Sequence, residues 1–185
     1  MQRMQNMTIV LITLLSSGLF TCCRKIRGKE QELTLQIQPY TGNQLRVDGY
    51  YYWTSEDNEG NEAFQIFFLY RNGVILSGGF PLAVDLSDQE EEFANGEYYN
   101  HVKDDKISWG RFQISENIIT YEKWYPSSGG PAPVYLHQGT ILNDTTFQIT
   151  SSRPSHGDGE FESLNRIYRF KHFAPKPDST NTFTG

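Results

Sequence analysis

Aromatic side chains near the ends of predicted strands are the residues of this chain best suited to holding a ligand. Each of the three tryptophans lies at a boundary between a β-rich segment and a loop. Flat rings around an apolar interior bind lipids, aromatic molecules or sugars, and they also fill protein cores. The candidate ligand-binding residues are Trp53, Phe64, Phe80, Trp109, Trp124 and Tyr135. We expect them to line a binding site, with an interior filled by side chains as the alternative.

Residue types that catalyse reactions or bind metals form no recognisable pattern. The densest group is His156, Asp158 and Glu160, and no second cluster lies at a spacing typical of metal sites. The chain contains no Gly-x-Ser-x-Gly, phosphate-binding loop or Cys-x-x-Cys pattern. We therefore expect no catalytic residue, metal or cofactor, with a hydrolase built on separated carboxylates as the alternative.

Acidic residues are concentrated in two predicted loops, 55–63 and 81–105. In the second loop, Ser87 is followed three positions later by Glu90, a capping-box pattern that predicts a short helix over residues 87–95. We expect this helix to lie over the mouth of the binding site. The acidic loops also suit docking to a protein partner, whereas a solvated charged surface is the simpler interpretation.

Strand patterns fill the chain after residue 44. Short runs of Val, Ile, Thr, Tyr, Phe and Trp are separated by Gly, Pro, Asn, Asp and Ser, as is typical of strands joined by turns. The predicted strands are residues 45–54, 64–71, 74–80, 106–114, 118–125, 134–142, 145–151 and 164–173. They predict an all-β domain over residues 45–173.

The connections between these strands alternate between tight and long. Tight turns are predicted at Asn72-Gly73, at 115–117 and at Asn143-Asp144, and the other connections are long. In an up-and-down meander, alternate connections lie at the same end, so the long loops gather around one mouth. Eight such strands suffice to close an antiparallel barrel, with a β-sandwich as the alternative.

This arrangement resembles a lipocalin-type barrel, in which long and short loops follow the same order. Gly49-Tyr50-Tyr51 is similar to the Gly-x-Trp start of that family, with Tyr51 in place of the tryptophan. Arg166 or Arg169 stands where the family has a late arginine that packs over that ring. The resemblance covers roughly residues 45–173. It implies a non-enzymatic barrel that binds a small apolar or aromatic ligand at its mouth.

The N-terminus resembles a bacterial lipoprotein signal. Residues 9–20 form an apolar run too short for a membrane-spanning helix of ~20 residues, and Leu19-Phe20-Thr21-Cys22 is similar to a lipobox. The resemblance implies a signal peptide over residues 1–21 and acylation of Cys22, with Cys23 as the alternative. The acyl chains would anchor the protein in the outer membrane of a bacterial envelope, on the periplasmic side.

The segments on either side of the barrel have distinct compositions. Residues 22–44 begin with the lipidated cysteine and continue as a basic linker suited to an anionic lipid surface. Residues 174–185 are rich in Pro, Ser and Thr and predict a disordered tail. Since both segments join the barrel at the tight-turn end, we expect the mouth to face away from the membrane.

Net charge limits the possible partners. The chain has 22 acidic and 16 basic side chains and a formal charge of −6, which argues against a nucleic-acid partner. The expected partners are the membrane, through the acyl anchor, and a small apolar ligand. The alternative is a protein-interaction module that uses the acidic loops within an envelope assembly.

Overall fold

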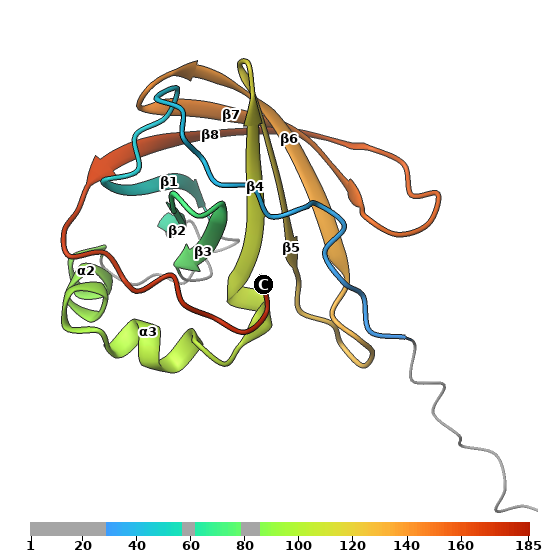
Figure 1. The fold of residues 1–185 in the computed structure, drawn as a ribbon, viewed down its shortest axis with the longest axis horizontal. Helices are drawn as coiled ribbons and strands as arrows, with labels where there is room; N and C mark the ends of the chain where they lie inside the picture. The colour runs from blue at the N-terminus through green and yellow to red at the C-terminus, as the bar shows by residue number, and fades with distance from the viewer. Residues whose placement is uncertain (1–28, 57–61, 79–85) are drawn as a thin grey trace, which may run out of the picture.

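A closed barrel of eight antiparallel strands forms the body of the molecule (Figure 1). The computed structural model describes residues 29–56, 62–78 and 86–185. The strands are β1 Gly49–Glu56, β2 Glu62–Leu69, β3 Val74–Gly78, β4 Trp109–Ser115, β5 Ile118–Trp124, β6 Val134–Asn143, β7 Thr146–Pro154 and β8 Glu162–His172. Each strand pairs with its neighbour in the chain, and β8 pairs back onto β1, where Tyr51 lies opposite Phe170. The predicted up-and-down barrel is confirmed, and the sandwich alternative is wrong.

Side chains alternate between the inside and the outside of the barrel, because successive residues of a strand point to opposite faces. One buried aromatic from most strands meets its counterparts inside the barrel. This inner cluster includes Tyr51, Phe67, Phe112, Tyr121, Phe147 and Tyr168. The other parity faces outward, as Tyr50, Phe68 and Leu76 do in β1–β3, and these side chains pack with Phe93, Tyr98 and Trp109 in what we call the outer cluster.

Tight and long connections alternate as the sequence predicts. The tight turns join β2 to β3, β4 to β5 and β6 to β7, and we call this end of the barrel the closed end. Gly73 adopts a φ of 85° in the first of these turns, and a Cβ there would lie 2.3 Å from the Gln38 carbonyl oxygen. A glycine is therefore required where the N-terminal segment crosses the turn. The connections 125–133 and 155–161 lie at the opposite end, the loop end.

Two short helices occupy the connection between β3 and β4. The predicted helix is present as α2 Leu86–Asn95, and α3 Glu97–Val102 and the 3₁₀ helix η1 Lys106–Ser108 follow it. Phe93 of α2 packs edge-on against Phe68 and Tyr98, with ring centroids 4.9 Å apart in both pairs. Since Phe68 points outward, α2 covers the outer face of the barrel. This corrects the expectation that it lies over the mouth.

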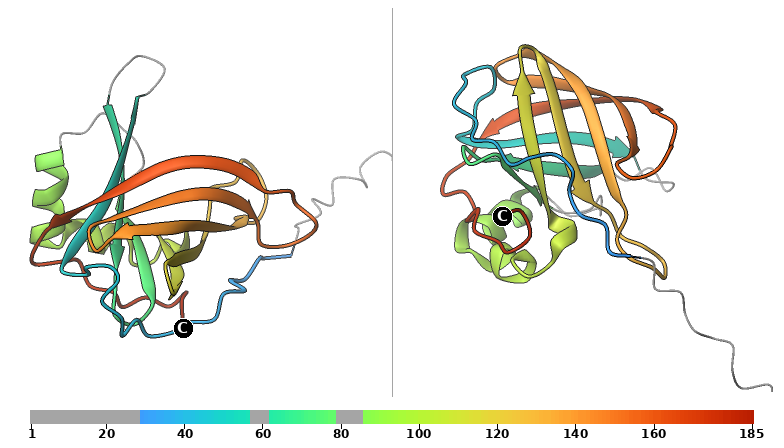
Figure 2. Two further views of the ribbon diagram at one scale, coloured as in Figure 1. Left: turned by 90° about the horizontal axis from the view of Figure 1, so that it is seen from above. Right: turned by 45° about the vertical axis from the view of Figure 1, so that its right-hand side comes forward.

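The N-terminal segment, residues 29–48, crosses the outside of the barrel from the loop end to the closed end (Figure 2). At the loop end, the Gln31 carbonyl accepts a hydrogen bond of 2.7 Å from Trp124 Nε1. Midway, the buried carboxylate of Glu122 accepts one of 2.7 Å from the Leu35 amide. At the closed end, the Tyr40 amide donates to Arg71 O over 2.8 Å. The chain thus enters at the loop end, which corrects the expectation that it enters opposite the mouth.

The C-terminal residues 174–185 lie against the barrel and the helices, which corrects the prediction of a disordered tail. Lys176 Nζ donates to the carbonyls of Val47 and Leu69, each over 2.8 Å. Arg111 Nε donates to Thr184 O over 3.0 Å, and Phe183 packs against the outer cluster. Contacts with distant residues hold the tail in place. The composition of the tail, which is rich in Pro and Ser, does not predict such contacts.

Within the described ranges, no helix is long and apolar enough to cross a membrane.

Candidate binding pocket at the loop end of the barrel

Side chains fill the middle of the barrel. The rings of Phe67 and Phe147 lie on the two faces of Tyr168, with centroids 5.1 Å and 4.9 Å away and interplanar angles of 17° and 11°. Tyr51 packs against Phe147 at 5.0 Å, nearer the closed end. These rings leave no room for a deep apolar channel, so the filled-interior alternative holds for this part of the barrel.

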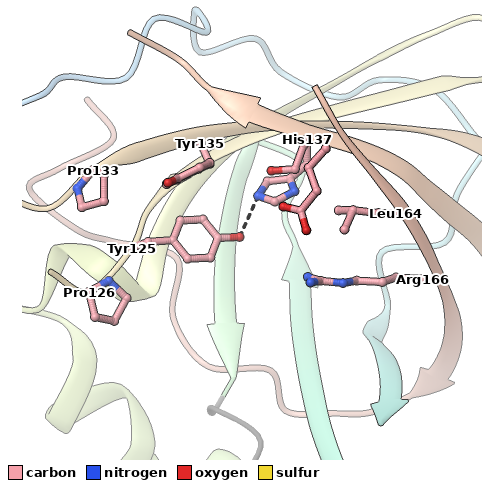
Figure 3. Close-up of a pocket in the computed structure, with 9 residues that line it drawn as sticks. Tyr125, Pro126, Pro133, Tyr135, His137, Leu164 and Arg166 are labelled. Carbon is pink, nitrogen blue, oxygen red and sulfur yellow. Dashed lines mark hydrogen bonds between the residues drawn. The ribbon is translucent and has the colours of Figure 1, made fainter. Parts of the chain in front are cut away.

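A pocket of about 320 Å³ opens above these rings at the loop end (Figure 3). Strands β6–β8 and the connection 125–133 provide its walls. Its apolar lining is Tyr125, Pro126, Pro133, Tyr135 and Leu164, and its polar lining is His137, Ser152, Glu162 and Arg166. A volume above ~300 Å³ with a mixed lining is typical of small-molecule sites.

Tyr125 and His137 form the central polar pair of the pocket. The Tyr125 hydroxyl lies 2.7 Å from His137 Nε2, and the imidazole stacks on Tyr121 at 4.5 Å. Burial, together with the positive charges of Arg166 and Lys123, lowers the pKa of His137 to about 3. The imidazole is therefore neutral at pH 7, and its weak basicity does not suit a general base.

Lys123 lies beneath this pair with its ammonium group enclosed by rings. Its side chain is 3% exposed, and Nζ lies 5.1 Å from the Tyr125 centroid and 5.8 Å from that of Phe67. Burial lowers the Lys123 pKa to about 8, and the carboxylate of Asp105 opposes this shift. Lys123 is therefore mostly protonated at pH 7. In the part of the chain that the structure describes, its ammonium has no hydrogen bond or ion pair.

Arg166 extends from β8 into the pocket towards Tyr125 and His137 (Figure 3). Its guanidinium lies 4.9 Å from the centre of the Trp53 ring, which supports it from below. Among the described residues, no carboxylate lies within ion-pair distance of it. The pocket lining therefore contains one cation, Arg166, that has an aromatic platform but no counter-ion among the described residues, and the ammonium of Lys123 lies behind the lining, against the Tyr125 ring.

The six residues predicted to bind a ligand do not meet in one place. Tyr135 lines the pocket, and Trp53 lies inside the barrel under Arg166. Phe64 and Trp109 belong to the outer cluster below the helices, and Trp124 is buried under the N-terminal segment. Phe80 lies outside the described residues. The prediction grouped these rings because all of them lie near strand ends. Alternate residues of a strand point to opposite faces, however, and three of the rings, Phe64, Trp109 and Trp124, lie on the outer face.

The arginine that the lipocalin resemblance places over the Tyr51 ring has a different partner in the structure. Arg166 packs over Trp53 rather than over Tyr51. Tyr51 instead packs on Phe170. Arg46 lies over the Phe170 ring, 4.6 Å from its centroid. Arg169 is exposed on the outer face of β8.

Lys123 and His137 were not predicted as site residues from the sequence, although both occupy inward-facing positions of their strands. Lys123 has the same parity as Ile119 and Tyr121, and both of those side chains are fully buried inside the barrel. His137 likewise has the same parity as the buried Ile141 on β6. A polar residue at an inward position of an otherwise apolar strand indicates either a buried network or a site.

Metal ligation and the acidic surface have less structural support. No three His, Cys, Asp or Glu side chains gather into a possible metal site within the described residues. On α2, Asp88, Glu91 and Glu92 are exposed, so docking of a protein partner to this surface stays a prediction.

Comparisons with protein-family models, with curated proteins and with solved structures find no match to this chain.

Proposed function

We propose that this protein is a lipid-anchored barrel of a bacterial envelope that binds a small ring-bearing or short apolar ligand in the loop-end pocket. The pocket carries this proposal, because it combines a closed scaffold with an open, partly aromatic cavity. Tyr125 and Tyr135 pack edge-on at 5.4 Å and offer their remaining ring surface to an occupant.

The filled interior limits the size of that ligand. The stacked rings of Phe67, Tyr168 and Phe147 lie directly below the pocket. A long acyl chain would need these rings to move apart, and displacing close-packed aromatics costs several kcal/mol. The favoured occupant is therefore compact, of the size of one or two rings or a short chain.

The proposed anchor has a geometric consequence for the pocket. Gln31 lies at the loop end, and Lys29 follows Cys22 by only seven residues, a reach of at most about 25 Å. An acyl group on Cys22 would therefore hold the loop end near the membrane. A ligand could then exchange between the membrane surface and the mouth.

The binding proposal is tested with N-phenyl-1-naphthylamine, a neutral aromatic dye that fluoresces in apolar sites. The protein is the mature chain with both cysteines replaced by serine, prepared without detergent. Leu164→Trp fills the pocket and should weaken dye binding about tenfold or more. Leu142→Trp is the matched control, because Leu142 is 52% exposed on β6. Equal dye binding by the two variants would overturn the proposal.

The anchor is tested by incorporation of labelled palmitate in bacterial cells. Wild type and Cys23→Ser should be labelled, whereas Cys22→Ser should not. Labelling that is lost only in Cys23→Ser would identify the alternative cysteine. An unlabelled wild-type protein would overturn the lipoprotein proposal and leave the pocket proposal unaffected.

A further inference from the structure

Lys123 and Arg166 place positive charge without an ion-pair partner among the described residues at the loop-end pocket. Two other partly buried cations donate to backbone oxygens instead, Arg71 to Tyr40 O and Gly42 O, and Arg111 to Leu35 O and Thr184 O. Arg153 resembles Lys123, because its buried Nε has no hydrogen-bond partner in the described structure and its guanidinium lies over the Phe161 ring. Lys123 has only ring contacts among the described residues, although its side chain is 3% exposed. Burying a charged side chain away from water without a partner costs free energy, so folded proteins rarely contain a buried charge of this kind.

The neighbouring polar groups add hydrogen-bond donors to this charge. Neutral His137 and Tyr125 have two acidic protons between them, and their single hydrogen bond uses one. Whichever tautomer is present, one N–H or O–H is left over. His137 Nδ1 is buried and has no partner among the described residues. Ser152, which lies opposite His137 in the β6–β7 register, supplies a further hydroxyl to the pocket lining.

Among the described lining residues, negative charge comes from one carboxylate at the rim of the pocket. Glu162 is the acidic member of the described lining, and its side chain is exposed to solvent. It forms no ion pair with Lys123 or Arg166 in the described structure. With both cations charged, these three side chains carry a net charge of +1, which one monoanion would neutralise.

We infer that the loop-end pocket binds a compact amphipathic monocarboxylate. The carboxylate lies between Arg166 and the Tyr125–His137 pair, above the ammonium of Lys123. The apolar part of the ligand packs against Tyr135, Leu164 and the Tyr125 ring. The planar guanidinium suits a carboxylate because its two N–H groups can bind both oxygens at once. This inference rests on the proposed function, since it specifies the head group of the ligand in the same pocket.

The carboxylate could come from a free aromatic acid or from a fatty acid of the nearby membrane. Both sources present the same head group to Arg166 and Lys123. They differ in the apolar part, because the stacked rings of Phe67 and Tyr168 limit its depth. The pocket volume of about 320 Å³ favours the aromatic acid.

Calorimetric titration with 2-naphthoate and 2-naphthamide tests the head group directly, because the two probes share a ring system and differ in charge. The protein is again the mature chain with both cysteines replaced by serine. We expect naphthoate to bind at least about tenfold more tightly than naphthamide, since charge-assisted hydrogen bonds are stronger than neutral ones. Dodecanoate is the third probe, and we expect it to bind more weakly than naphthoate.

Variants identify the groups that recognise the charge. Arg166→Gln and Lys123→Met should each weaken naphthoate binding about tenfold and leave naphthamide binding unchanged. Arg169→Gln is the control for the first, because Arg169 is exposed on the outer face of the same strand. Lys176→Met is the control for the second, because Lys176 is a partly buried lysine outside the pocket. Thermal melting of every variant confirms that it is folded.

The outcomes separate the inference from the proposed function. Equal affinity for acid and amide would overturn the carboxylate inference and leave a pocket for neutral rings. Failure of both naphthalene probes and of the neutral dye would overturn the two together. Tighter binding of dodecanoate than of naphthoate would support the carboxylate but assign it to a membrane lipid. Unchanged naphthoate affinity in both Arg166→Gln and Lys123→Met would overturn the placement of the head group.

Discussion

Lys123, which is buried, and Lys176, which is partly buried, lie at opposite ends of the barrel and have different surroundings. Lys176, at the closed end, donates to two backbone carbonyls and lies 4.1 Å from the centre of the Tyr70 ring. Lys123, at the loop end, has two ring contacts and no hydrogen bond in the described structure. Burial lowers the pKa of both lysines to about 8. The same desolvation is thus accompanied by hydrogen-bond acceptors at one end and by none among the described residues at the other.

This difference separates a structural role from a binding role. At the closed end, Lys176 joins the tail to residues that precede β1 and end β2, and every bond serves the fold. At the loop end, the fold retains a charge that lowers its own stability. Binding sites commonly sacrifice stability in this way, because a group that is paired within the protein has less capacity to bind a ligand.

The largest expected contrast concerns the tyrosines at the two ends. Tyr51 is fully buried against Phe147 and Phe170, and Tyr51→Ala should lower the free energy of unfolding by about 3–5 kcal/mol. Tyr125 faces a solvent-accessible pocket, so Tyr125→Ala should cost less than half as much. Urea unfolding monitored by circular dichroism measures both. Equal losses would show that the loop end is packed as tightly as the closed end.

Replacing each lysine by methionine should change stability in opposite directions. Lys176→Met removes two charge-assisted hydrogen bonds worth ~1.5–3 kcal/mol each, which outweighs relief of desolvation, so the variant loses about 1–2 kcal/mol. Lys123→Met removes an uncompensated charge and should gain about 1–3 kcal/mol at pH 7. Chemical unfolding at pH 7 compares the two. A destabilised Lys123→Met variant would mean that the ammonium has a stabilising partner.

The pH dependence should identify this charge as the cause. The Lys123 pKa is lowered on folding, so the unfolded chain binds more protons above pH 8, and wild-type stability rises with pH from about 8 to 10.5. The advantage of Lys123→Met should therefore shrink by about 1.4 kcal/mol per pH unit between pH 8 and 10.

Nearby groups do not obscure this window. His137 is already neutral above pH 8, and burial raises the pKa of Tyr125 and of Tyr121 above the ordinary value of a tyrosine. Unfolding of both proteins at four pH values from 7 to 10 makes the measurement. An advantage that stays constant with pH would assign the stability change to packing rather than to charge.

The smallest expected effect comes from acidic residues at the two ends. Glu162→Gln removes the rim carboxylate of the pocket and should strengthen naphthoate binding about two- to threefold, because exposed charges interact weakly. Asp48→Asn breaks the exposed ion pair with Arg46 near the closed end and should leave naphthoate binding unchanged. Calorimetry measures both. Tighter binding in both variants would indicate a general effect of net charge rather than a local effect at the mouth.

Part of the candidate site was accessible from the sequence. Tyr135 and the loop-end position of the pocket follow from strand ends and loop lengths, and Arg166 was singled out through the lipocalin resemblance. The error for Trp109 and Trp124 arose because strand ends were predicted without the direction of each side chain. Parity counted from known inward residues, Phe112 on β4 and Tyr121 on β5, would have placed both rings outside and Lys123 inside.

The sequence by itself determined the eight strands, the alternation of tight and long connections, the helix at residues 87–95 and hence the up-and-down barrel. These depend on local patterns: alternation with period two, turn residues and a helix cap. Only the tertiary structure decided where the chain enters, how the tail is held and which cations lie in or next to the pocket lining. Those features depend on contacts such as that of Gln31 with Trp124 and of Lys176 with Val47, which lie 93 and 129 residues apart in the chain. Local patterns cannot encode such pairs, because barrel closure is what brings them together.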